Sequence, residues 1–335
     1  MALSSPKENR LGELDGLRGI AAFIVLLFHL SFFYDTSHLA PFAVPWGHYG
    51  VELFFIISGF VIFMTLERGG GIRAFIASRI ARLYPAYWAA VLVTTLTAAV
   101  LEDPPNLIPV AAINLTMLQA FLAIPPIDNS YWTLALEGEF YVLMGLLAAT
   151  GQLRRIDLWC LVALLAGFAA HAMQAAGLMA WPQALPLLFV DYVNFFVIGI
   201  CLYRLREGAG THLTRAVLAL AIIYAGQGGG KFSLNPSGST YLPIALACAA
   251  ITWCAVTGRL PFLRTRPLLW FGGISYPLYL VHQRIGTGTM NWLGLRGVPG
   301  WAAFTAAVLT VIALAAAIEY WIDRPFRPRL RRALS

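Results

Sequence analysis

The sequence has few charged side chains. Only 12% of its 335 residues are Asp, Glu, Lys or Arg, whereas 59% are hydrophobic and the mean hydropathy is +0.72. Because a soluble domain has about 25% charged residues, this shortage excludes an ordinary soluble enzyme and indicates a protein with several membrane spans. A small-residue cleavage site after the first apolar run is also lacking, so we interpret that run as an uncleaved helix.

Other features are absent as well. The four cysteines lie inside apolar runs without CxxC spacing, so we expect small buried side chains and neither disulfides nor a metal site: Cys160, Cys201, Cys248 and Cys254. No internal repeat and no matching pair of Gly/Pro-broken helices is visible, which argues mildly against a secondary transporter. The longest stretch between predicted spans is about 102–130, so we predict a single membrane domain over 1–335, with its core at about 11–325 and no separate soluble domain.

Ten apolar stretches are long enough to cross a bilayer, which takes about 20 residues. We therefore predict an all-α polytopic membrane protein with spans near 17–34, 47–66, 83–101, 131–150, 158–180, 186–203, 214–229, 241–257, 268–285 and 300–322. The stretch 106–124 is interrupted by Asn114, Thr116 and Gln119, and either forms an eleventh span or lies in the membrane without crossing it.

The basic residues decide between these topologies. With a cytoplasmic N-terminus and ten spans, most of the 23 Lys and Arg residues fall on the cytoplasmic side, as the positive-inside rule expects. An eleventh span would move most of those that follow it to the far side. We therefore predict that both termini lie in the cytoplasm and that the protein is located in the inner (cytoplasmic) cell membrane. The net charge of +7 then reflects topology and contact with anionic membrane lipids, and nucleic-acid binding is not expected.

Arg18 and His29 lie eleven residues apart in the first apolar run. Eleven residues make about three helical turns, so both side chains fall on one face, about 16 Å apart along the axis. Ionisable groups at membrane depth are costly and face a protein interior or a watery cavity, which makes the pair a functional-site hypothesis. The structural alternative is an arginine that reaches the inner headgroups and a buried, hydrogen-bonded histidine.

Further charged residues occur at membrane depth. Glu137 and Glu139 each cost about 2–3 kcal/mol near a helix centre, and they point about 200° apart, so only one can face a given cavity; we favour Glu137. Arg79 and Arg82 share one helix face at i and i+3. They are either a cytoplasmic anchor beside an aromatic belt or a functional pair.

Several polar residues are weaker candidates. His282 and Glu52 are predicted near the outer ends of their spans, where they either contact a substrate or close interhelical hydrogen bonds. Asp191 and Asn194 allow the same structural interpretation. Asp15 is a possible N-cap of the first helix. Ser58, in SGF, is interpreted as part of a small-residue packing site, because no GxSxG elbow surrounds it.

Six sequence motifs follow one another along essentially the whole chain: ELDGLRGIAAFIVLLFHL, GVELFFIISGFVI, SRIARLYPAYW, SYWTLALEGEFY, GISYPLYLVHQ and IDRPFR. Together they resemble the membrane-bound acyltransferase 3 family of bacterial O-acyltransferases, in the stand-alone form without an SGNH domain that includes exopolysaccharide and nodulation-factor enzymes. The resemblance implies about ten transmembrane helices, a cytoplasmic acyl-CoA donor (acetyl-CoA is expected), and transfer to a hydroxyl of a cell-envelope carbohydrate or lipid-linked glycan.

The resemblance also implies roles for single residues. Arg18, Arg79 and Arg82 would bind the phosphates of CoA, for which the guanidinium fork is suited. His29 would act as general base towards the acceptor hydroxyl, or carry the acyl group transiently. Glu137 occupies the glutamate position of the family's WSLxxE motif, with Thr133 in place of its serine, and would orient His29 or bind acceptor hydroxyls.

A second function class remains open at this stage. A transporter or flippase for a glycan or lipid-linked intermediate would also line its path with buried polar residues. Dependence on acyl-CoA distinguishes the two classes, because only the acyltransferase consumes it.

Overall fold

The computed structural model describes residues 11–33, 35–102, 104–178, 188–227 and 241–334. Within these ranges the regular structure is entirely helical, which confirms the all-α prediction. The α-helices are α1 Gly12–Phe28, α2 Gly50–Glu67, α3 Gly71–Leu101, α4 Leu107–Asn114, α5 Trp132–Ala149, α6 Ile156–Ala175, α7 Leu188–Arg206, α8 His212–Tyr224, α9 Tyr241–Val256, α10 Arg266–Gly294, α11 Gly300–Ala317 and α12 Arg324–Leu334.

Over the residues that the structure describes, each of the ten predicted spans coincides with a helix; the predicted ends 179–180, 186–187 and 228–229 lie outside these residues. Among the described residues, six helical segments are long and apolar enough to cross a membrane: Gly12–Phe33, Pro45–Glu67, Gly71–Leu101, Asn129–Ala149, Gln152–Ala175 and Gly300–Leu334. The helices α8 and α9 are apolar but shorter, and α7 and α10 correspond to the two remaining predictions. The polytopic architecture is therefore confirmed.

Three parts differ clearly from the prediction, and one of them is α10, which continues to Gly294 and not to about residue 285. The third helix begins at Gly71 and not near residue 83, so Arg79 and Arg82 lie about 12 and 16 Å inside it. In the stretch 106–124, α4 has only eight residues, about 12 Å, and is too short to cross the bilayer. Left-handed backbone at Asn106 and Met117 interrupts the helix on both sides, so this stretch is not an eleventh span.

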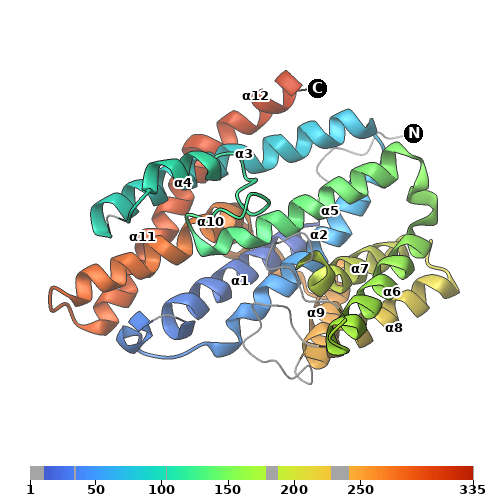
Figure 1. The fold of residues 1–335 in the computed structure, drawn as a ribbon, viewed down its shortest axis with the longest axis horizontal. Helices are drawn as coiled ribbons and strands as arrows, with labels where there is room; N and C mark the ends of the chain where they lie inside the picture. Colours follow the sequence, from blue (N-terminus) through green and yellow to red (C-terminus); the bar gives the residue numbers. More distant parts are fainter. Residues whose placement is uncertain (1–10, 34, 103, 179–187, 228–240, 335) are drawn as a thin grey trace.

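The helices form two groups around separate hydrophobic cores. Figure 1 shows α6, α7, α8 and α9 gathered on one side of the molecule, and α3, α4, α11 and α12 on the other. The helices α1 and α2 lie between the groups, and α1 packs along α10. Consequently α1 and α10 place their side chains where the two groups meet.

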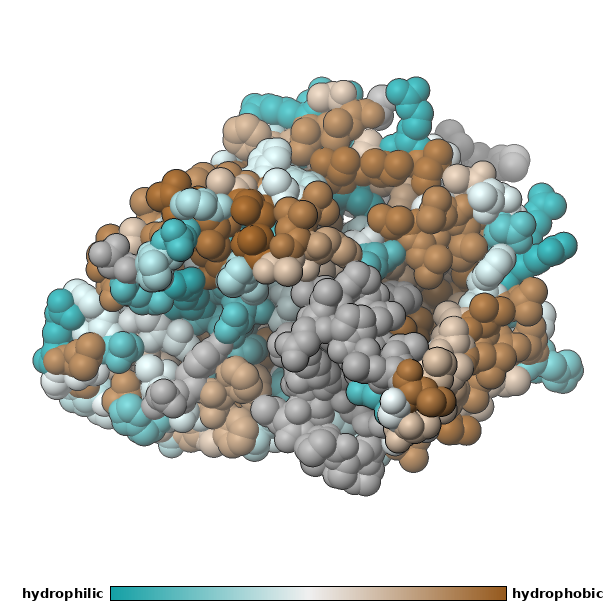
Figure 2. Space-filling view, in the orientation of Figure 1, coloured by the Kyte–Doolittle hydropathy of each residue, from teal (hydrophilic) through white to brown (hydrophobic). Residues whose placement is uncertain are grey.

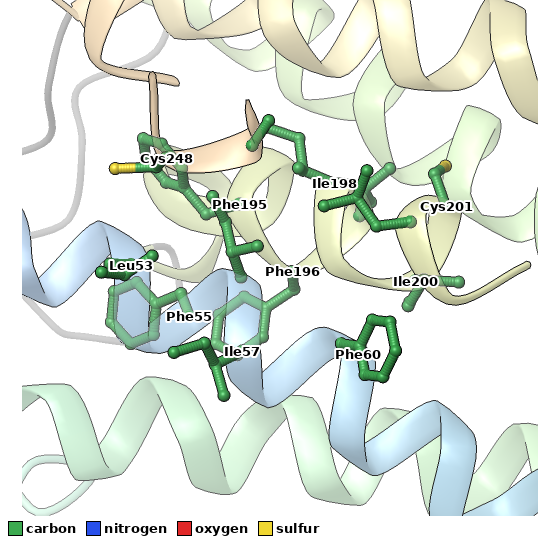
Figure 3. Close-up of a cluster of buried hydrophobic side chains, with 14 of the residues drawn as sticks. Leu53, Phe55, Ile57, Phe60, Phe195, Phe196, Ile198, Ile200, Cys201 and Cys248 are labelled. Atoms are coloured by element: carbon green, nitrogen blue, oxygen red, sulfur yellow. The ribbon is translucent and has the colours of Figure 1, made fainter. Parts of the chain in front are cut away.

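Close backbone contact joins α2 to α7. Figure 3 shows Phe55 of α2 facing Phe196 of α7, with ring centroids 4.8 Å apart. A Cβ atom on Gly59 would lie 2.1 Å from the carbonyl oxygen of Phe196, so only glycine fits there. The small-residue interpretation of the SGF motif is therefore confirmed for Gly59.

The outer surface carries many large apolar side chains. Figure 2 shows hydrophobic residues covering broad parts of one face. Leu96 of α3 and Val142 of α5 are each 66% exposed, and Trp321 is 77% exposed. Apolar surface of this extent is rare on soluble monomers and fits contact with lipid tails.

Candidate active site

The packing of α1 against α10 brings His29 beside His282. The two helices touch through their backbones, since a Cβ atom on Gly272 would lie 2.1 Å from the carbonyl oxygen of Asp15. At His29 the α-helical hydrogen bonding of α1 gives way to a π-helical turn, His29–Phe33. Such turns are rare and often occur at functional sites. The His29 Nδ1 atom lies 3.1 Å from His282 Nε2.

Hydrogen bonds assign the protons of this histidine pair. His282 Nδ1 lies 2.7 Å from the carbonyl oxygen of Tyr279, which only accepts, so a neutral His282 carries its proton on Nδ1. Its Nε2 is then an acceptor. His29 Nδ1 lies beside this acceptor and also 2.9 Å from the carbonyl oxygen of Val25. Because both neighbours only accept hydrogen bonds, Nδ1 must be the protonated nitrogen of the His29 ring. The lone pair of a neutral His29 is therefore on Nε2.

Asp128 holds the segment that packs on the outer half of α10. Its carboxylate is buried and accepts hydrogen bonds from the backbone N–H of Ser130 at 2.8 Å and of Arg284 at 2.9 Å. The Arg284 guanidinium in turn binds Glu102 through two nitrogens, at 2.7 and 3.1 Å. These contacts fix the register of α10 close to His282. The sequence reasoning missed Asp128, although an Asp two residues before a serine at a helical turn is a capping signal.

A second part of the site is a cavity of about 810 Å³, including the part open to solvent. Its apolar wall comes mainly from α2, whereas its polar side chains come from α1, α2, α3, α5 and α10. The polar and aromatic lining consists of Arg18, Ser58, Arg79, Arg82, Thr133, Glu137, Tyr141, Ser275, Tyr276 and Tyr279. A largely apolar cavity with a few convergent polar groups is the usual form of a ligand site.

The three predicted arginines meet in this cavity, although they come from two helices. Arg18 pairs with Asp15 at 3.6 Å, and Arg82 lies 3.9 Å from Asp323. Arg79 stacks over the rings of Phe75 and Tyr141, each about 5.8 Å from its guanidinium carbon. The convergence of these positive charges supports the prediction that they bind one anionic group.

Glu137 lines the same cavity. Its carboxylate accepts hydrogen bonds from Ser58 Oγ at 3.0 Å and from the Tyr141 hydroxyl. The hydrogen bond between side chains that joins α1 to α10 at His29 comes from His282. The sequence motifs contained Ser58 and Tyr141, but nothing in their spacing indicated that both would bind Glu137.

Tyr279 contacts both the cavity and the histidine pair. Its side chain lines the cavity, and its hydroxyl hydrogen-bonds with Thr133 Oγ1 at 3.0 Å. Its ring centroid is also 5.3 Å from that of His282. Tyr279 therefore connects the cavity lining to the histidines.

The remaining candidates, Glu52, His282 and Glu139, do not line the arginine cavity. Glu52 is 3% exposed, and its α2 neighbours Val51, Phe54 and Phe55 line the cavity whereas Glu52 does not. His282 is 1% exposed, so it faces His29 within the protein. Glu139 does not line the cavity of Glu137, as its angular position predicts.

The structure also tests two predictions of a structural role, for Asp15 and Asp191. Asp15 is not the N-cap: α1 begins at Gly12, because the polar residues before the apolar run continue the helix, and Leu11 is the capping position. Asp191 Oδ1 lies 3.5 Å from His171 Nε2, which fits its structural interpretation. Within the described ranges, no three His, Cys, Asp or Glu side chains come together as metal ligands.

Comparison with known proteins shows which family the chain belongs to. A family model described as an acyltransferase domain, Acyl_transf_3, matches residues 11–320. The acyltransferase MdmB of Streptomyces mycarofaciens is 25% identical, over 93% of this chain and 89% of its own length. BcsY of Komagataeibacter xylinus, whose name describes a membrane-bound transacylase, is 25% identical over 93% of this chain and 82% of its own length. YrhL of Bacillus subtilis, named as a peptidoglycan O-acetyltransferase, is 25% identical over 96% of this chain and 56% of its own length. No solved structure matches.

Proposed function

Because the chain belongs to the acyltransferase 3 family and is a membrane-bound acyltransferase, we propose that it moves an acyl group from acyl-CoA to a carbohydrate hydroxyl. The donor is acetyl-CoA, approaching from the cytoplasm, and the acceptor belongs to the cell envelope or to an exported or lipid-linked glycan. The name of the Bacillus relative supports both acetyl transfer and an envelope acceptor.

The donor occupies the arginine cavity. Arg18, Arg79 and Arg82 bind the diphosphate of CoA, whose charge explains why three cations gather at membrane depth. The pantetheine arm then extends along the apolar wall towards Thr133 and Tyr279. Glu137 lies beside this route, where it holds Ser58 and Tyr141 in place.

The hydrogen-bond chain from Tyr279 through His282 to His29 is the observation that carries the proposal. It leaves His29 Nε2 unprotonated and fixes the plane of the ring. As the acceptor hydroxyl attacks, Nε2 takes its proton while the oxygen bonds to the thioester carbon. The carbon–sulfur bond then breaks, and the protonated His29 gives its Nε2 proton to the departing CoA thiolate.

The test uses purified protein in detergent and measures release of free CoA from acetyl-CoA. The wild type is expected to bind acetyl-CoA and to release CoA. In His29→Ala the turnover falls about 10²–10⁴-fold, the usual contribution of a general base, whereas acetyl-CoA binding is retained. His212→Ala, which alters an exposed histidine at the start of α8, serves as the control. If the wild type neither bound nor consumed acetyl-CoA, and His29→Ala kept its biological activity, the proposal would be abandoned.

A further inference from the structure

A second cavity lies beyond the arginine cavity, towards the side predicted to be cytoplasmic. It encloses about 660 Å³, including the part open to solvent. Its walls come from the end of α2, the start of α3, the C-terminal end of α5 with the turn after it, and α12. Figure 1 shows α12 beside α3, and contacts along both helices confirm this. None of these residues has a role in the function proposed above.

The lining combines apolar side chains with one cation. Leu66, Ile72, Phe75 and Leu153 supply apolar surface, and Arg331 of α12 supplies a guanidinium. The backbone of Gly69–Gly71 closes one side, and nothing lies within 4 Å of the Cβ position of Gly69 or Gly71. Glycine backbone with this much room lets a ligand approach closely. A flat aromatic base that carries a phosphate has the complementary chemistry.

The state of the arginines supports an anionic ligand. Arg18 and Arg82, in the first cavity, each have a carboxylate partner, Asp15 and Asp323. By contrast, neither Arg79 nor Arg331 forms an ion pair with any residue that the structure describes. Two cations without a carboxylate partner therefore line neighbouring cavities, one in each.

The two cavities adjoin at α3. Arg79 lines the first cavity and donates a hydrogen bond from Nη2 to Ser78 Oγ, at 3.0 Å, and Ser78 lines the second. Phe75 lines the second cavity, and its ring lies under the Arg79 guanidinium. A ligand with phosphates beside Arg79 can therefore extend past Ser78 into the second cavity.

We propose that the second cavity binds the 3′-phosphoadenosine end of acyl-CoA, with Arg331 paired to the 3′-phosphate and the apolar side chains around the adenine. The inference rests on the proposed function, because it extends the same donor from the arginine cavity to the cytoplasmic surface. It assigns α12 to donor recognition.

Equilibrium binding of CoA and of dephospho-CoA, which lacks only the 3′-phosphate, to the purified full-length protein tests this assignment. The wild type is expected to bind CoA about tenfold more tightly than dephospho-CoA, a typical effect of one charge-assisted pair. Arg331→Ala removes this difference by weakening CoA binding alone. Arg329→Ala removes the same charge from the same helix, but Arg329 stacks on Phe326 and does not line the cavity, so it keeps the difference.

The possible outcomes separate the two proposals. Equal affinity of the wild type for both ligands, or equal loss of both in Arg331→Ala, overturns the inference and leaves the proposed function standing. Absence of CoA binding altogether overturns the proposed function and the inference with it. A lipid phosphate is the competing ligand. If Arg331→Ala weakened CoA binding only in vesicles containing phosphatidylglycerol, and not in phosphatidylcholine vesicles, the arginine would bind a lipid headgroup and the inference would fail.

Discussion

His282 determines which nitrogen of His29 can accept a proton. A free imidazole exchanges its proton between two nitrogens, and only one tautomer leaves Nε2 as a base. The carbonyl oxygen of Tyr279 fixes the proton of His282, and His282 fixes that of His29. The sequence left both a substrate contact and an interhelical hydrogen bond open for His282; the structure shows the hydrogen bond to His29, and we propose that His282 is a positioning residue.

Replacement of His282 tests this role. His282→Phe keeps a planar ring but offers no acceptor to His29, so we expect kcat to fall about tenfold, the worth of one hydrogen bond, with little change in KM for acetyl-CoA. His282→Gln provides an amide oxygen for His29 and an N–H for Tyr279, and should recover much of the loss. Equal kcat values for the two variants would contradict the positioning role.

The contact between His29 and His282 could not be predicted from the sequence. Both histidines stand in motifs and both were selected as site residues, but 253 positions separate them. Helical periodicity gives the face of a residue on its own helix and says nothing about which distant helix it meets. For the same reason Glu137 was selected correctly as a buried polar residue, while its partners Ser58 and Tyr141 were not foreseen.

At the scale of the elements, the close packing of α1 on α10 positions the histidine pair. A larger residue at Gly272 would push α10 away from the carbonyl of Asp15 and separate His29 from His282. We expect Gly272→Val to lower the stability of the protein by about 1–3 kcal/mol, as overpacking does, and to reduce acetyl-CoA turnover.

The neighbouring glycine offers a matched control. A Cβ atom on Gly273 would meet nothing within 4 Å, so Gly273→Ala should leave both the thermal unfolding temperature and turnover close to the wild-type values. If Gly272→Val also left them unchanged, the packing argument for the α1–α10 pair would be wrong.

The presence of the membrane-spanning helices was predicted better than their boundaries and their local hydrogen-bonding pattern. The hydrophobic runs revealed each span, because about 20 apolar residues have few other uses. The start of α3 was placed too late, since Arg73, Arg79 and Arg82 interrupt the apolar residues of its N-terminal part. The π-helical segments His29–Phe33 and Ile318–Asp323 were invisible as well. They leave the composition of a span unchanged and depend on tertiary contacts such as that of Asp323 with Arg82.

At the scale of the whole molecule, the proposed donor site and the proposed catalytic histidine occupy different places. The arginines line a cavity together with Tyr279, and Tyr279 contacts His282, which is not part of that lining. In the proposed function, the donor enters at one membrane face and reacts nearer the other. Composition and charge alone predicted the membrane architecture, whereas the shared cavity of α1, α3 and α5 required the folded chain.

The most direct test of the account is the kinetic comparison of Arg18→Lys and His29→Ala with acetyl-CoA. Lysine cannot reproduce the paired hydrogen bonds of a guanidinium to phosphate. We therefore predict that Arg18→Lys raises KM about tenfold and nearly preserves kcat, while His29→Ala abolishes transfer and nearly preserves donor binding. Identical defects in kcat and in donor binding for the two variants would contradict the separation of donor anchorage from chemistry.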